Sequence, residues 1–92
     1  MKIMEFYKTN KFKKDFRRMK KRGADLSKLT AVLQFLINQQ PLPPVYRDHL
    51  ILSGECKNIH DAHIAPDWIL LYEIQDEVIV LHRTGSHSDL NF

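Results

Sequence analysis

Two apolar runs in the last third of the sequence constrain the fold more than any other feature. Residues 68–74 and 78–83 are apolar almost throughout, and only Gln75-Asp76-Glu77 separates them. A polar link this short joins two strands into an antiparallel hairpin. The near-continuous apolar character of both runs is typical of central strands that are covered on at least part of both faces. The sequence therefore predicts a sheet built around this hairpin.

The N-terminal third predicts one strand followed by a basic helix. Residues 2–7 mix apolar and charged side chains in a way that favours a short strand. Thr9 or Asn10 can cap a helix over residues 11–22, and Gly23 suits the left-handed position just beyond its end.

A second helix and a further strand complete the pattern. Asp25 or Ser27 can cap a helix, more apolar than the first, that runs to about residue 39. Residues 57–64 then form a strand before the hairpin. We expect one α+β domain over residues 1–92. Its N-terminal strand and two-helix hairpin precede antiparallel strands that form a roughly four-stranded sheet, with the helices on one face.

Composition limits the class of protein. The apolar fraction of 43% and the charged fraction of 27% are ordinary for a soluble globular domain. No apolar stretch has the length of a membrane span or of a secretory signal. A single cysteine, Cys56, excludes an intrachain disulfide and a multi-cysteine zinc site. We expect a cytoplasmic protein with no membrane partner.

Charge is distributed unevenly along the chain. Residues 1–28 carry a net charge of +8, whereas residues 29–92 carry −5. Such asymmetry suggests a polyanionic or acidic protein partner for the first third, although a solvated helix face is the simpler alternative. The candidate basic patch for such a partner consists of Lys13, Lys14, Arg17, Arg18, Lys20 and Lys21.

All five histidines lie between positions 49 and 87. Imidazole can both give and take a proton near neutral pH. Cleavage of RNA needs a base for the 2′-hydroxyl, an acid for the departing 5′-oxygen and cations for the phosphoryl oxygens. The side chains that can supply these without a metal are His49, His63, His87, Asp67, Lys57 and Arg83.

Two histidines and a possible metal site have simpler interpretations. His82 lies inside an apolar strand, and His60 faces away from His63 on an extended strand, so we expect both to be structural. His60, His63 and Asp67 could together hold zinc or iron, but only a helix would place the two histidines on one face.

Two other candidates could also be structural. Trp68 could belong to the core, where a lone tryptophan is found more often than on a base-stacking surface. Arg83 could pair with Glu73 or Asp89.

Three segments carry a resemblance to a known family. They are residues 41–49 (PLPPVYRDH), 61–72 (DAHIAPDWILLY) and 83–90 (RTGSHSDL). With these motifs the chain resembles the RelE/ParE superfamily of bacterial toxins and is most similar to the YafQ-type mRNA interferases. The similarity covers essentially the whole chain.

The resemblance implies a function and a set of site residues. It implies ribosome-dependent cleavage of A-site mRNA without a metal or other cofactor, and neutralisation by a cognate antitoxin in a complex that binds operator DNA. The implied acid–base residues are His49, His63, Asp67 and His87, with His87 as general acid, His49 or His63 as base and Asp67 orienting or sharing the proton. The implied substrate-binding residues are Trp68, Arg83, Lys57 and Phe92.

The chain departs from the family pattern at three places. Cys56 stands where the family usually has tryptophan, and His60 where it has arginine. The segment 49–54 is one residue longer than usual, and Asn91 separates Leu90 from the C-terminal aromatic.

The sequence leaves two other functions open. One is a non-catalytic or gyrase-directed ParE-like toxin or binding protein on the same scaffold. The other is a metalloenzyme, which a chelator would inactivate.

Overall fold

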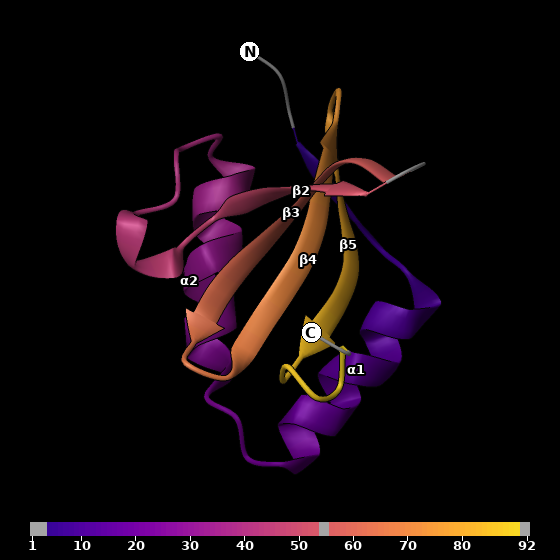
Figure 1. The fold of residues 1–92 in the computed structure, drawn as a ribbon, viewed down its shortest axis with the longest axis vertical. Helices are drawn as coiled ribbons and strands as arrows, with labels where there is room; N and C mark the ends of the chain where they lie inside the picture. The colour runs from indigo at the N-terminus through magenta and orange to yellow at the C-terminus, as the bar shows by residue number, and fades with distance from the viewer. Residues whose placement is uncertain (1–3, 54–55, 91–92) are drawn as a thin grey trace.

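The computed structural model describes residues 4–53 and 56–90, and for residues 51–53 and 56–58 only their backbone. In this part of the chain a five-stranded sheet packs against two helices (Figure 1). The elements in chain order are β1 (Glu5–Lys8), α1 (Asn10–Lys21), α2 (Leu26–Ile37), the 3₁₀ turn η1 (Pro44–Tyr46), β2 (His49–Ser53), β3 (Cys56–Ala65), β4 (Trp68–Gln75) and β5 (Val78–Gly85). None of the helices in these residues is long and apolar enough to cross a membrane.

The sheet has the strand order β1-β5-β4-β3-β2. The predicted hairpin of β4 and β5 is confirmed and lies centrally, with β3 antiparallel to β4. β1 pairs with β5 in parallel, so the first strand along the chain lies beside the last. The α+β class is confirmed, and the sheet gains a fifth strand, β2, which the sequence did not predict and which pairs antiparallel with β3.

Local capping explains where the helices begin and end. The Thr9 side chain accepts a hydrogen bond from the Phe12 N–H at 3.0 Å, and Asp25 accepts one from the Ser27 N–H at 3.1 Å. Gly23 adopts the expected left-handed conformation with φ of 78°. The second helix ends at Ile37, two residues before the predicted limit, because the chain turns at Gln39 with φ of 56°.

Both helices cover one face of the sheet. Phe12 and Met19 of α1 and Leu29, Val32 and Leu36 of α2 are buried in a single core cluster. The sheet contributes alternate residues to it, including Ala62 and Ile64 of β3, Leu70 and Tyr72 of β4, and Ile79 and Leu81 of β5. The opposite face of β3 is therefore free to carry polar groups.

Candidate active site

The alternation of β3 separates its apolar residues from its titratable ones. Ala62 and Ile64 point into the core, so Asp61 and His63 lie on the other face of the sheet. His49 joins them, because the register of β2 places it directly opposite Asp61. Three titratable side chains thus share one face at neighbouring positions.

Asp61 lies between two of the predicted catalytic histidines. Its carboxylate oxygens are 3.7 Å from Nδ1 of His49 and 3.8 Å from Nε2 of His63. These distances exceed hydrogen-bond length but allow a charge on Asp61 to stabilise either imidazolium. The carboxylate is only 15% exposed, and its Oδ1 has no hydrogen-bond partner among the described residues.

Asp61 was missed as a site residue by the sequence analysis. The signal was present, since Asp61 lies two positions before His63 and a strand places both on one face.

A second carboxylate–imidazole pair continues this face. Oδ1 of Asp67, in the β3–β4 turn, accepts a hydrogen bond from the His87 N–H at 3.0 Å and lies 2.6 Å from Nδ1 of the same histidine. The backbone hydrogen bond and then the ring contact lower the pKa of Asp67, which keeps the carboxylate ionised. An ionised carboxylate only accepts, so Nδ1 of His87 carries the hydrogen and Nε2 is left for proton transfer.

His63 connects the two pairs. Its ring centroid is 5.8 Å from that of His87, with the planes at 65°. The four predicted acid–base residues are thereby brought to one face, together with Asp61, in the spatial order His49, Asp61, His63, His87, Asp67.

The turn that carries His87 is anchored to α1. Asp89 accepts hydrogen bonds from Arg22 at 2.6 and 3.1 Å and from the Ser86 N–H at 3.0 Å. These bonds, with Arg22 as the largest contributor, lower the pKa of Asp89 well below its usual value. Gly85 permits this close approach, because a Cβ there would lie 3.0 Å from the Cβ and Oδ2 of Asp89. Helix α1 therefore fixes the position of His87.

Trp68 lies in the core, which is the alternative that the sequence left open beside a contact with substrate. The side chain is 4% exposed, and its Nε1–H donates to Oγ1 of Thr84 at 2.8 Å. That hydroxyl in turn donates to the Ile69 carbonyl at 2.9 Å. The indole has no free face for a base, and it supports the ends of β4 and β5 from beneath the site.

Arg83 binds a carboxylate of α1 that the sequence did not suggest as its partner. Its Nε and Nη2 donate to Asp15 of α1 at 2.6 and 3.2 Å, and this pairing raises the pKa of the guanidinium. Asp15 is 3% exposed and also accepts hydrogen bonds from Arg18 at 2.7 Å and from the Thr84 N–H at 3.2 Å. Arg83 is therefore bound to a buried carboxylate, and neither Glu73 nor Asp89 is its hydrogen-bond partner.

The basic patch is partly used within the protein. Lys13, Lys14, Arg17, Lys20 and Lys21 are exposed on α1, as expected. Arg18, by contrast, is held by Asp15 and lies 3.7 Å from Asp89. The side chain of Lys57 and the whole of Phe92 lie outside the described residues, so the structure does not place these two predicted substrate contacts.

The remaining histidines are structural, as expected. His60 stacks on Tyr72 with centroids 5.0 Å apart, and its Nδ1 lies 3.3 Å from Asp48. The Tyr72 hydroxyl donates to the same carboxylate at 2.7 Å, and burial, followed by this bond, raises the pKa of Tyr72. His82 lies 3.0 Å from Glu73.

His60 and His63 fall on opposite faces of β3, so the metal set considered from the sequence does not form. Within the described residues, no group of three or more histidine, cysteine or carboxylate side chains is arranged to hold a metal.

Comparison with known proteins places the chain in a family. The sequence profile described as "Bacterial toxin of type II toxin-antitoxin system, YafQ" matches residues 4–91. The mRNA interferase toxin YafQ of Escherichia coli K12 is 42% identical over 83 residues, which cover 89% of each chain. The crystal structure of the E. coli DinJ-YafQ toxin-antitoxin complex matches with a TM-score of 0.87 at 39% identity, covering 96% of this chain and 97% of that one.

A structure of a metal-bound toxin from Helicobacter pylori matches with a TM-score of 0.85 at 38% identity, covering 95% of this chain and 98% of that one. Profile, sequence relatives and folds agree with the resemblance seen in the three motifs. The chain belongs to the YafQ family of bacterial toxins of type II toxin–antitoxin systems.

Proposed function

We propose that this chain is an mRNA interferase that cuts mRNA in the ribosomal A site by metal-independent acid–base catalysis. The observation that carries the proposal is the row of imidazoles and carboxylates on the open face of the sheet. The E. coli relative is named an mRNA interferase toxin, which supports the general activity.

In this mechanism His63 is the general base. It lies beside the Asp61 carboxylate and is 23% exposed, whereas His49 is 66% exposed at the start of β2. His63 takes the proton of the 2′-hydroxyl, and the 2′-oxygen attacks the adjacent phosphorus. The imidazolium that forms is stabilised by Asp61.

His87 is the general acid. As the bond from phosphorus to the 5′-oxygen breaks, protonated His87 gives its Nε2 proton to that oxygen. Asp67 holds the ring in place through Nδ1 and so directs Nε2 to the departing oxygen. The products are a 2′,3′-cyclic phosphate and a 5′-hydroxyl, and each positioned proton donor or acceptor contributes about 10²–10⁴ in rate.

The proposal includes the partners and compartment that the family resemblance implies. A cognate antitoxin neutralises the chain, as the DinJ-YafQ complex suggests by its similarity. The exposed lysines and arginine of α1 approach ribosomal RNA, and operator DNA is contacted only through the antitoxin complex. All of these partners place the protein in the cytoplasm.

The test is to map mRNA 5′ ends in growing cells after induction. The wild type should yield new 5′ ends at A-site codons and arrest growth, while His87→Ala should lower cleavage by about 10²-fold or more. His82→Ala, which removes the imidazole beside Glu73, is the matched control and should cleave like the wild type. Unchanged cleavage by His87→Ala would refute the acid–base assignment.

Two further readouts separate the alternatives. Cleavage in a translating extract should survive a chelator, whereas a metalloenzyme would lose activity. Growth arrest with intact mRNA and signs of DNA damage would favour the gyrase-directed toxin instead.

A further inference from the structure

We infer that the pocket beside His63 is a subsite for one nucleotide of the RNA, and that Arg47 holds the backbone phosphate there. The inference rests on the proposed function, because it names the substrate contacts of the same site. In this inference Arg47 has the role of the phosphate-binding cation, for which the sequence had suggested Arg83.

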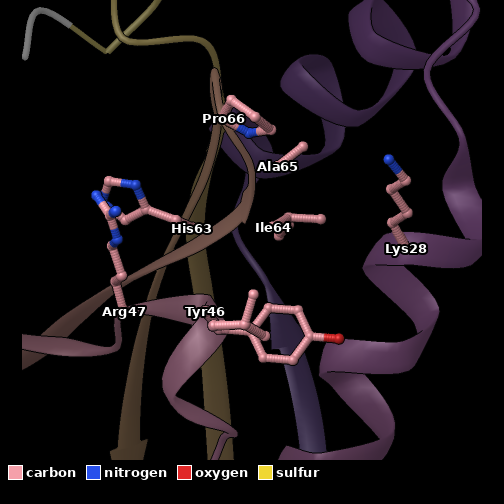
Figure 2. A pocket seen from close by; sticks show the side chains of 8 residues that line it. Lys28, Tyr46, Arg47, His63, Ile64, Ala65 and Pro66 are labelled. Carbon is pink, nitrogen blue, oxygen red and sulfur yellow. The ribbon is translucent and has the colours of Figure 1, made fainter.

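The pocket lies where η1, β3 and α2 meet, and its volume is about 380 Å³. This is within the range of small-ligand pockets. Its lining residues are Lys28, Val45, Tyr46, Arg47, His63, Ile64, Ala65 and Pro66. In Figure 2 the Arg47 side chain extends toward the His63 ring, and Lys28 reaches in from α2 on the opposite side.

The PLPPVYRDH segment fixes Arg47 in this place. Pro44 opens a single 3₁₀ turn, and the Arg47 N–H donates to the Pro44 carbonyl at 3.0 Å. Arg47 then adopts a left-handed conformation with φ of 47° and ψ of 50°. A residue with a Cβ is uncommon there, and such strain gathers at functional sites. The ring of Tyr46 packs 6.3 Å from that of Phe35, which anchors the turn to α2.

Arg47 is also available for a ligand. In the described part of the chain its guanidinium makes no hydrogen bond or ion pair. Arg83 and Arg22, by contrast, are bound to Asp15 and Asp89. An exposed guanidinium beside a catalytic imidazole suits bidentate binding of a phosphate.

The chemistry of the walls favours RNA as the occupant. Arg47 lies next to the proposed general base and would hold the phosphate nearest the cleaved bond. Ile64, Ala65 and Pro66 form an apolar wall for a base, and Lys28 lies across the pocket for the next phosphate. An acidic peptide of the antitoxin could use the same cations, but it would not need the catalytic histidine in the wall.

The test is a titration of the ¹⁵N-labelled chain with a 2′-deoxy trinucleotide, which has no 2′-hydroxyl and cannot be cleaved. The amides of Arg47 and Ala65 should shift, and Arg47→Gly should weaken binding about tenfold or more. Arg47→Gly suits the left-handed backbone, so its Tm should be unchanged or higher. Arg47→Lys should bind with intermediate affinity, and Lys8→Ala, at an exposed position on β1 outside the pocket, should bind like the wild type.

The outcomes of the two proposals are distinguishable. Wild-type trinucleotide binding by Arg47→Gly would overturn the subsite even if the wild type cleaves mRNA as proposed. Arg47-dependent binding without any cleavage by the wild type would sink the proposed function and leave the subsite standing. If Arg47→Gly weakens only binding of the antitoxin, the pocket belongs to that protein and the inference is wrong.

Discussion

Replacing Asp15 by alanine is expected to destabilise the protein by about 3 kcal/mol, because its carboxylate is the shared acceptor between α1 and the free edge of β5. β1 covers β5 only from Val78 to Leu81, so the Thr84 N–H beyond it needs another acceptor. Asp15 supplies it at 3.2 Å while binding Arg83 and Arg18.

The magnitude follows from what the substitution leaves unpaired. Removing one member of a buried ion pair costs about 3–5 kcal/mol, and an orphaned buried N–H costs about 1–3 kcal/mol. The side chains of Arg83 and Arg18 are 31% and 37% exposed, so both can turn partly to water. Because both guanidinium groups can be partly hydrated, the expected loss lies near the lower end of the 3–5 kcal/mol range, at about 3 kcal/mol. This corresponds to a fall in Tm of roughly 12–24 °C for a domain of this size.

Urea denaturation measures the free energy of unfolding directly. Asp25→Ala is the matched control, since it removes an exposed capping carboxylate and should lower the stability much less. The double variant Asp15→Leu with Arg83→Met should recover part of the loss, because it also removes the guanidinium that Asp15→Ala leaves without its partner, although Arg18 and the Thr84 N–H still lose their acceptor. A loss for Asp15→Ala no larger than that for Asp25→Ala would refute the reasoning.

Three further predictions concern Asp61, Asp89 and the helix surface. Asp61→Asn keeps the shape of the side chain but removes the charge beside His63, so mRNA cleavage should fall at least tenfold with Tm nearly unchanged; equal cleavage would exclude Asp61 from catalysis. The lowered pKa of Asp89 means that its contribution to stability is complete above the unfolded pKa of about 4 and is lost as pH falls through the folded value. Unfolding curves of wild type and Asp89→Asn should therefore differ at pH 7, begin to converge below about pH 4 and meet only below the folded pKa, and a constant difference would contradict this linkage. Substituting Lys13, Lys14 and Arg17 should weaken ribosome binding and lower its salt slope by about one per lost phosphate contact, and an unchanged slope would show that the patch does not bind RNA.

Local signals in the sequence were sufficient for the helices and the central hairpin. Thr9 and Asp25 cap their helices through contacts two or three residues away, and Gly23 ends the first helix through its own backbone. The two-residue period of β4 also predicts that Trp68 is buried, because Trp68 shares its face with Leu70 and Tyr72, which are both core residues. The family motif assigned Trp68 to substrate, although the period of the strand places it in the core.

Pairings between distant residues could not be predicted from local pattern. Asp15 and Arg83 are 68 positions apart, and nothing near either residue specifies the other. β2 is short, and its pairing with the edge of β3 joins residues that no local pattern links. Arg47 was overlooked because its importance depends on a left-handed turn that brings it beside His63.

The parallel pairing of β1 with β5 has a consequence for how the chain folds during its synthesis. Glu5 is aligned with Val78, so the first strand can find its place only after the last strand has been synthesised. Closing so long a loop is slow compared with forming the helices. The anchored turn that carries His87 comes later still along the chain. An unfinished chain therefore lacks the complete row of imidazoles and carboxylates, which can form only when the chain has been nearly completed.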